Sequence, residues 1–194
     1  MRRVSLDDII GLARYEEIRD QFRKRIIELK KVRRVPVGDH VTFVFENFDT
    51  VLFQIQEMLR AEHIADLDHI REEMDVYNEL IPGPGELSST MLIEITEQDR
   101  IRPELVRLIG IDRCVALAIG EDIRVPAVFE GGRSKEDKLS AVQYVLFQLD
   151  EAAQAAFARK NVTARLVIDH ANYRASAPIE GAVRESLQAD LVSP

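Results

Sequence analysis

The chain has 194 residues, of which 46% are hydrophobic and 31% are charged, and its formal net charge is −8. This length fits one domain with a buried core, or one domain with a helical appendage, because domains average ~150 residues. The acidic balance argues against general nucleic-acid binding, whose affinity comes from Lys and Arg side chains on phosphates. With Cys114 as its single cysteine, one chain can form neither a disulfide framework nor a multi-cysteine zinc or iron–sulfur site.

The sequence carries no sign of export or membrane insertion. Residues 1–8 are charged and lack the apolar core of a signal peptide. No apolar run approaches the ~20 residues that a membrane-spanning helix needs. We therefore expect a cytoplasmic protein that does not bind membranes.

The first part of the chain is predicted to be mainly helical. Apolar residues recur at helical spacing in several segments, and Pro36 indicates an edge strand. The expected elements are a helix that starts at Ser5, helices at 15–31, 50–62 and 66–78, and strands at 34–37 and 41–46. The end of the helix at 15–31 is strongly basic, which fits a solvated face or a surface for an anion or an acidic partner.

Residues 81–86 read Ile-Pro-Gly-Pro-Gly-Glu and are the clearest break in the chain. Two prolines and two glycines stop a helix and force a shaped loop. We interpret this loop as the junction between a helix-rich 1–80 and a sheet-rich 86–194 within a single domain, 1–194. It is not a phosphate-binding loop, because the Gly-Lys-Ser/Thr ending is missing.

The second part is predicted to contain most of the sheet. Expected strands are 90–95, 163–169 and a hairpin of 114–119 with 123–130, and expected helices are 103–109 and 178–191. Ser134 and Asp137 resemble a helix start, and the apolar spacing after them predicts one helix to about residue 159, with a buried strand at 140–149 as the alternative. The order indicates an α+β fold: a mostly antiparallel sheet with helices packed on one side and a helical N-terminal extension.

Three carboxylates are the leading candidates for a site. Glu46 and Glu94 lie in or beside apolar strands, and Glu57 lies on the helix that follows Glu46. Buried carboxylates must be paired, protonated or metal-bound. If they converge, with Arg60 nearby, they form a general acid/base pair or a hard metal site. The alternative is that Arg60, Arg124 or another arginine holds them in structural salt bridges.

The histidines and the cysteine offer weaker candidates. Asp66 and His69 are three residues apart on an expected helix, and Asp169-His170 near Tyr173 is a possible acid/base group. His170 is also a candidate metal ligand together with Glu46, Glu57 and Glu94. The spacing of Asp66 and His69 is also common by chance, and ordinary solvated turn chemistry also explains Asp169-His170. Cys114 fits a small core residue better than a nucleophile.

Several longer segments carry a resemblance to a known family. They are residues 41–60, 77–90 and 140–147, with shorter similarity at 4–9 and 169–173. These segments resemble the bacterial family catalogued as domain of unknown function DUF3501. The resemblance assigns no catalytic residue. Genes of this family are often found near genes for rubrerythrin-like and heterodisulfide-reductase-like iron–sulfur proteins. By association, the resemblance implies a role in redox or peroxide metabolism.

Three functions follow as hypotheses. The first is a cytoplasmic accessory or binding protein that works beside an iron–sulfur or non-haem-iron redox system. Its expected partner is an iron–sulfur or rubrerythrin-like redox protein, and we expect a homodimer. The second is a metal-dependent oxidoreductase or hydrolase that uses the carboxylates and a divalent metal. The third is a small-anion sensor that uses the basic helix or the Pro-Gly loop.

Overall fold

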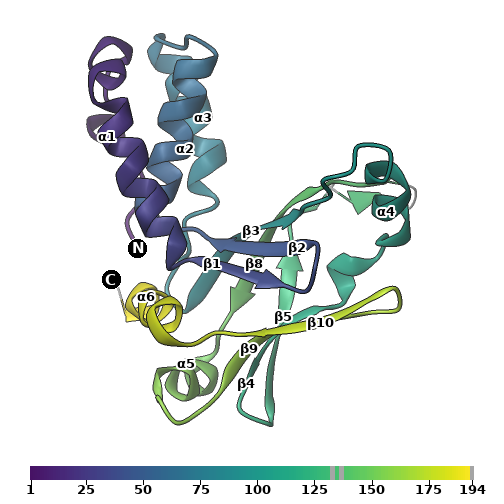
Figure 1. Ribbon diagram of the computed structural model, residues 1–194. Coiled ribbons are helices and arrows are strands. Elements are labelled where there is room, and N and C mark those ends of the chain that lie inside the picture. The colour runs from purple at the N-terminus through teal and green to yellow at the C-terminus, as the bar shows by residue number, and fades with distance from the viewer. Residues whose placement is uncertain (132–133, 136–137, 193–194) are drawn as a thin grey trace.

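A computed structural model describes residues 1–131, 134–135 and 138–192. Figure 1 shows helices α1, α2 and α3 standing as an extension beside a strongly curved sheet, with α5 and α6 at one end of the sheet and α4 at the other. The helices are η1 Leu6–Asp8, α1 Leu12–Lys31, α2 Phe48–Ala61, α3 Leu67–Asn78, α4 Ile101–Arg107, η2 Ile111–Arg113, α5 Glu151–Ala158 and α6 Gly181–Val192. None of the described helices is long and apolar enough to cross a membrane.

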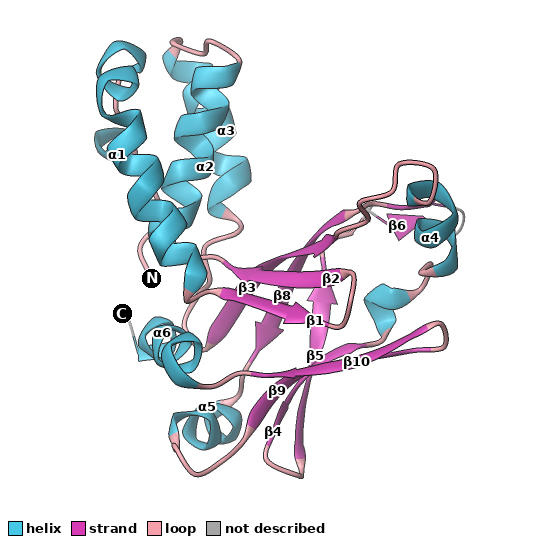
Figure 2. Cartoon of the chain, viewed as in Figure 1, coloured by secondary structure: helices cyan, strands magenta, loops and turns pink. Residues whose placement is uncertain are grey.

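Eight strands form one antiparallel sheet in the order β1-β2-β3-β8-β5-β4-β9-β10 (Figure 2). Their bounds are β1 Arg34–Val37, β2 Val41–Phe45, β3 Glu86–Ile93, β4 Val115–Ile119, β5 Ile123–Phe129, β8 Val142–Gln148, β9 Ala164–His170 and β10 Tyr173–Pro178. Two short strands, β6 Ser134–Lys135 and β7 Lys138–Leu139, pair separately. The α+β class and the antiparallel sheet that the sequence predicts are confirmed.

The curvature brings the first and last strands of the sheet together. The Tyr173 hydroxyl, on β10, donates to the Val37 carbonyl oxygen (2.6 Å) and accepts from the backbone N–H of His40 (3.0 Å). Gly38, in the turn after β1, has φ +72°, and a Cβ there would lie 2.6 Å from the same hydroxyl. The sheet therefore nearly closes on itself, with the Tyr173 hydroxyl joining its two edge strands.

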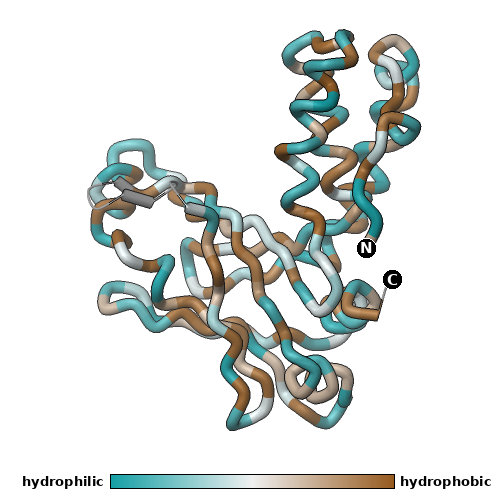
Figure 3. The backbone as a smooth tube through the Cα atoms, turned by 180° about the vertical axis from the view of Figure 1, so that it is seen from behind, coloured by the Kyte–Doolittle hydropathy of each residue, from teal (hydrophilic) through white to brown (hydrophobic). Residues whose placement is uncertain are grey.

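Two hydrophobic clusters hold the chain together. The larger fills the inside of the curved sheet, where alternate residues such as Phe43, Phe45, Leu87 and Phe147 are almost fully buried. The smaller joins the N-terminal segment to α2 and α3, and Tyr144 of β8 packs against it. Figure 3 shows the matching alternation of hydrophobic and hydrophilic residues along the strands. Tyr144 thus links the helical extension to the outer face of the sheet.

The single long helix expected at 134–159 is wrong. Residues 142–148 form β8 and residues 151–158 form α5, as in the alternative that the sequence left open. Between them, the Asp150 carboxylate accepts from the Ala153 N–H (2.8 Å) and caps the new helix. Asp137, half of the expected helix start, lies outside the described residues. The hairpin of β4 and β5 is confirmed.

The near-closure of the sheet predicts a cost for Tyr173→Phe. The variant keeps the ring but removes the hydroxyl that joins β10 to β1, so the free energy of unfolding should fall by about 1–3 kcal/mol. Urea denaturation measures it. Arg174→Gln, next along the strand, removes only an exposed ion pair with Asp169 and should change stability by less than about 0.5 kcal/mol. Equal effects of the two variants would contradict this account of closure.

Candidate binding site

The outer face of the sheet meets the helical extension in a corner. One row of paired residues crosses four strands there: Arg34 opposite Val44, Val44 opposite Thr90, and Thr90 opposite Tyr144. The corner holds a cavity of about 240 Å³, here called the corner cavity. It is lined by Lys30, Arg34, Val44, Glu46, Gln54, Thr90, Leu92, Val142 and Tyr144.

Glu46 is the most unusual residue in the corner cavity. It directly follows β2, and its backbone N–H donates to the Ser88 carbonyl oxygen (2.8 Å). Its side chain is only 2% exposed. Oε1 accepts a hydrogen bond from the Thr90 hydroxyl (2.6 Å), whereas the buried Oε2 has no hydrogen-bond partner among the described residues. A buried polar oxygen without a donor costs free energy, so this atom requires an explanation.

The turn from strand to helix fixes Glu46 in this position. Asn47 caps α2: its side-chain oxygen accepts from the Thr50 N–H (3.0 Å), and the Thr50 hydroxyl accepts from the Asn47 N–H (2.9 Å). The chain therefore enters the helix immediately after Glu46. The Arg33 guanidinium also donates to the Glu46 carbonyl oxygen (2.9 Å). Both backbone polar groups of Glu46 are thus occupied, and its carboxylate lies beneath the helical extension.

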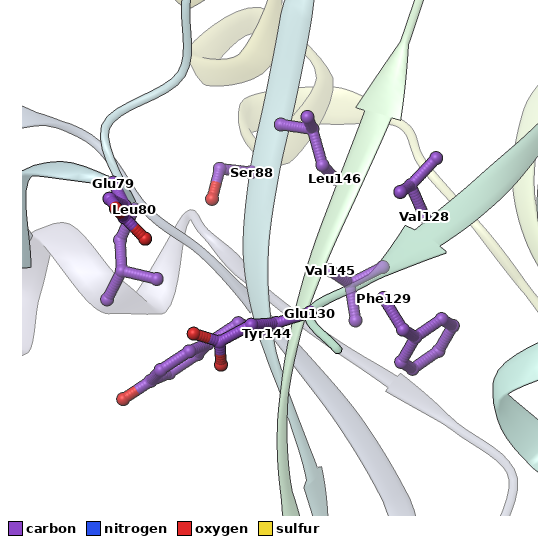
Figure 4. Close-up of a pocket in the computed structure, with 9 residues that line it drawn as sticks. All are labelled: Glu79, Leu80, Ser88, Val128, Phe129, Glu130, Tyr144, Val145 and Leu146. Atoms are coloured by element: carbon purple, nitrogen blue, oxygen red, sulfur yellow. The ribbon is translucent and has the colours of Figure 1, made fainter. Parts of the chain in front are cut away.

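A second cavity, of about 210 Å³, lies on the same outer face. Figure 4 shows its lining: Glu79, Leu80, Ser88, Val128, Phe129, Glu130, Tyr144, Val145 and Leu146. Tyr144 lines both cavities. Its side chain is therefore shared by the corner cavity and the second cavity farther along the sheet.

Glu57 and Arg60 do not reach the corner cavity. Glu57 accepts from Nε and Nη2 of Arg19 (2.8 and 2.7 Å) and from the Tyr15 hydroxyl (2.8 Å). These hydrogen bonds connect α2 to α1. The Arg19 hydrogen bonds hold the pKa of Glu57 below its usual value, against the effect of burial. Arg60 instead pairs with Glu16 (2.9 Å). The structure therefore does not bring Glu57 and Arg60 together with Glu46.

Glu94 lies at the opposite end of the same strand pair from Glu46. The Glu94 backbone N–H donates to the His40 carbonyl oxygen, so all of β2 separates the two glutamates. Its carboxylate accepts from the Thr42 hydroxyl (2.6 Å) and from Arg34 (2.6 Å). The Thr42 hydrogen bond and then Arg34 lower the pKa of Glu94. The salt-bridge alternative holds for Glu57 and Glu94, with Arg19 and Arg34 as partners instead of Arg60 and Arg124.

His170 is a structural residue at the end of β9. Its Nδ1 accepts from the Asn172 N–H (3.3 Å), so Nε2 carries the proton and donates to the Ile109 carbonyl oxygen (3.1 Å). Asp169 pairs with Arg174, and the Tyr173 hydroxyl closes the sheet, so the three do not form an acid/base group. In the described ranges, no group of three or more His, Cys, Asp or Glu side chains is placed to hold a metal ion. The metal set Glu46, Glu57, Glu94 and His170 is not brought together.

The other sequence candidates also have local explanations. Asp66 caps α3 and pairs with the exposed His69 (3.2 Å). The Sγ atom of Cys114 lies 3.5 Å from the Gly110 carbonyl oxygen. In the Pro-Gly loop, the Glu86 carboxylate already accepts from the Gly83 N–H (2.9 Å). Because this N–H is already hydrogen-bonded within the chain, the loop has one fewer hydrogen-bond donor for an anion.

Comparison with known proteins assigns the family. A family model described as "Protein of unknown function (DUF3501)" matches residues 3–191. The chain belongs to this family. It is also similar to a crystal structure at 1.90 Å of a novel protein of unknown function from Burkholderia pseudomallei, with 33% identity over 98% of this chain and 100% of that one, and a TM-score of 0.92. No functionally curated protein matches the sequence.

Sequence reasoning found one residue of the corner cavity in this DUF3501 protein and missed its companions. Glu46 was detectable as a carboxylate at the end of an apolar strand. The sequence predicts Lys30 only as part of the basic helix end and Arg34 and Thr90 only as strand residues. Tyr144 falls in the long helix predicted to residue 159, with a strand as the alternative. Their shared position depends on strand pairing and on where α1 ends, and neither leaves a local sequence signal. Gln54 of α2 also lines the cavity.

The Glu57 ion pair predicts a pH-dependent stability. Because Arg19 depresses the pKa of Glu57 in the folded protein below the 4.5 of an unperturbed glutamate, the unfolded chain takes up this proton at a higher pH than the folded one. The stabilisation is complete above the unfolded pKa and is lost as the pH falls through the folded pKa. The free energy of unfolding of wild type should exceed that of Glu57→Gln by about 1–2 kcal/mol at neutral pH. This difference should shrink at acidic pH.

Denaturant unfolding of both proteins across this pH range measures that difference. Glu17→Gln is the matched control, because Glu17 pairs with Arg14 on the exposed surface of α1. Its effect should stay below about 0.5 kcal/mol throughout. A Glu57 effect that is independent of pH would show that the ion pair is not its source.

Proposed function

We propose that this protein is a non-catalytic binding protein, with a small ligand held in the corner cavity. The observation that carries the proposal is Glu46, a buried carboxylate with one oxygen that accepts no hydrogen bond from any described residue. A bound donor would remove the cost of that oxygen. Such a carboxylate also gives specificity, because a ligand without a hydrogen-bond donor would leave the carboxylate unpaired.

A binding role is better supported than catalysis by the carboxylates. Arg19 and Arg34 neutralise Glu57 and Glu94, so neither is available as a general base at its position. Besides Glu46, the acid/base side chains in the lining of the corner cavity are those of Lys30 and Tyr144. The cavity is also below the range of about 300–1,000 Å³ that is common for drug-sized ligands. A small molecule is the better match.

Thermal unfolding with a panel of compounds tests this function. The panel contains amines, polyols, organic acids and metal salts. A ligand at 100 times its dissociation constant stabilises by about 2.7 kcal/mol, or roughly 5–10 °C for a chain of this size. We expect at least one donor-bearing compound to raise the Tm of wild type in proportion to its logarithmic concentration and to leave Glu46→Gln unchanged.

The control is Glu121→Gln, in the exposed turn between β4 and β5. This variant should respond to the ligand like wild type. If no compound on the panel shifts the Tm, or if Glu46→Gln shifts as much as wild type, the corner cavity is not a ligand site. Circular dichroism of the variants without ligand checks that each is folded.

We also propose that the protein works in the cytoplasm beside an iron–sulfur or rubrerythrin-like redox protein. Only the family resemblance and its genomic neighbours support this part, and homodimerisation stays a prediction. Affinity capture from the native host, under anaerobic conditions, should recover such a partner in amounts comparable to the bait. Repeated recovery of the bait without any iron-containing protein would contradict it.

A further inference from the structure

The corner cavity contains two charged groups of opposite sign that do not meet. The first is the Glu46 carboxylate, whose buried Oε2 has no donor among the described residues. Lys30, in the last turn of α1, contributes an ammonium group that forms no hydrogen bond or ion pair with any residue the structure describes. Both residues line the same cavity, and the structure shows no ion pair between them.

The neighbouring basic residue does not change this pattern. Arg34 also lines the cavity, but its guanidinium is held by Glu94 (2.6 Å) outside it. The Thr90 hydroxyl already donates a hydrogen bond to Oε1 of Glu46. The residues that line the cavity therefore include one buried acceptor without a donor, one ammonium without a partner among the described residues, and the amide of Gln54.

The chemistry of these groups selects a ligand. An ionised carboxylate only accepts hydrogen bonds, and a protonated amine is the donor that also offsets its charge in a buried site. A lysine ammonium only donates, and a carboxylate is its natural complement. Val44, Leu92 and Val142 supply apolar contacts for a short hydrocarbon between the two ends.

We propose that the corner cavity binds a short zwitterion, a small amino acid whose ammonium contacts Glu46 and whose carboxylate contacts Lys30. This inference rests on the proposed binding function and names the ligand class of the same site. It involves no covalent step. The cavity of about 240 Å³ restricts the ligand to a few carbon atoms.

Isothermal titration calorimetry at low ionic strength and neutral pH tests the proposal. The ligands are glycine, β-alanine and γ-aminobutyrate, which differ in the distance between ammonium and carboxylate. Butyrate and butylamine are the matched half-molecules, each with one charge only. We expect one zwitterion to bind with a stoichiometry of one per chain and about tenfold or more tighter than either half-molecule, because both charge-assisted contacts are then made.

Two variants assign the two ends. Glu46→Gln should weaken the zwitterion by about tenfold or more and leave butyrate binding unchanged. Lys30→Met should weaken the zwitterion by a similar factor and leave butylamine binding unchanged. Lys31→Met is the control, because the adjacent Lys31 pairs with Glu28 on the surface and should leave all affinities unchanged. Unfolding temperatures of the three variants confirm that each is folded.

Other outcomes overturn the proposal in distinguishable ways. A half-molecule that binds as tightly as the zwitterion shows that only one charged group is used. Butylamine that binds more tightly to Lys30→Met shows that Lys30 pairs with Glu46 itself in solution. If none of the zwitterions binds while another compound stabilises wild type but not Glu46→Gln, the ligand class is wrong and the binding function stands. If nothing binds in either experiment, both fail.

Discussion

The buried guanidinium of Arg33 is the interaction on which the arrangement of this protein depends. Arg33 lies between α1 and β1, is 1% exposed, and donates to the carbonyl oxygens of Phe45 and Glu46. On its other side it contacts Ser186 and Asp190 of α6. A buried cation must have its donors satisfied. Arg33 therefore joins the helical extension, the end of β2 and the C-terminal helix at a single point.

The position of the corner cavity is a consequence of these Arg33 contacts. α1 leads into β1 and α2 leaves from β2, so the helical extension stands over the outer face of the two neighbouring strands. Arg33 fixes the carbonyl group of Glu46, and the Asn47 cap turns the chain into α2 at the next residue. The Glu46 side chain is then only 2% exposed. Its burial is a consequence of how the two parts of the chain are joined, and not of a hydrophobic environment alone.

The sequence predicted the fold best where local signals are strong. Strand β2, helix α2, helix α3 and the β4–β5 hairpin lie close to their expected positions, because capping residues and turns mark them. Strand β8 was misread because residues on both its faces are apolar: Val145 and Phe147 face the core, and Tyr144 and Leu146 face the second cavity. Such a strand imitates helical spacing. Strand β10 alternates between small and polar residues, and its place beside β1 depends on closure of the whole sheet.

The candidate site was predictable only in part, for a related reason. Glu46, Glu57 and Glu94 give the same sequence signal, a carboxylate beside apolar residues, yet only Glu46 lacks an arginine. The partners of the other two come from distant positions: Arg19 is 38 residues from Glu57, and Arg34 is 60 residues from Glu94. The pattern shows a carboxylate beside apolar residues, but it shows neither whether the carboxylate is buried nor what neutralises it. Of the three, only Glu46 is buried, whereas Glu94 is exposed. In this fold the two arginines belong to α1 and β1, which pack across α2 and β2, and neither guanidinium pairs with the Glu46 carboxylate. The carboxylate that remains without a cation is therefore the one with capacity for a ligand.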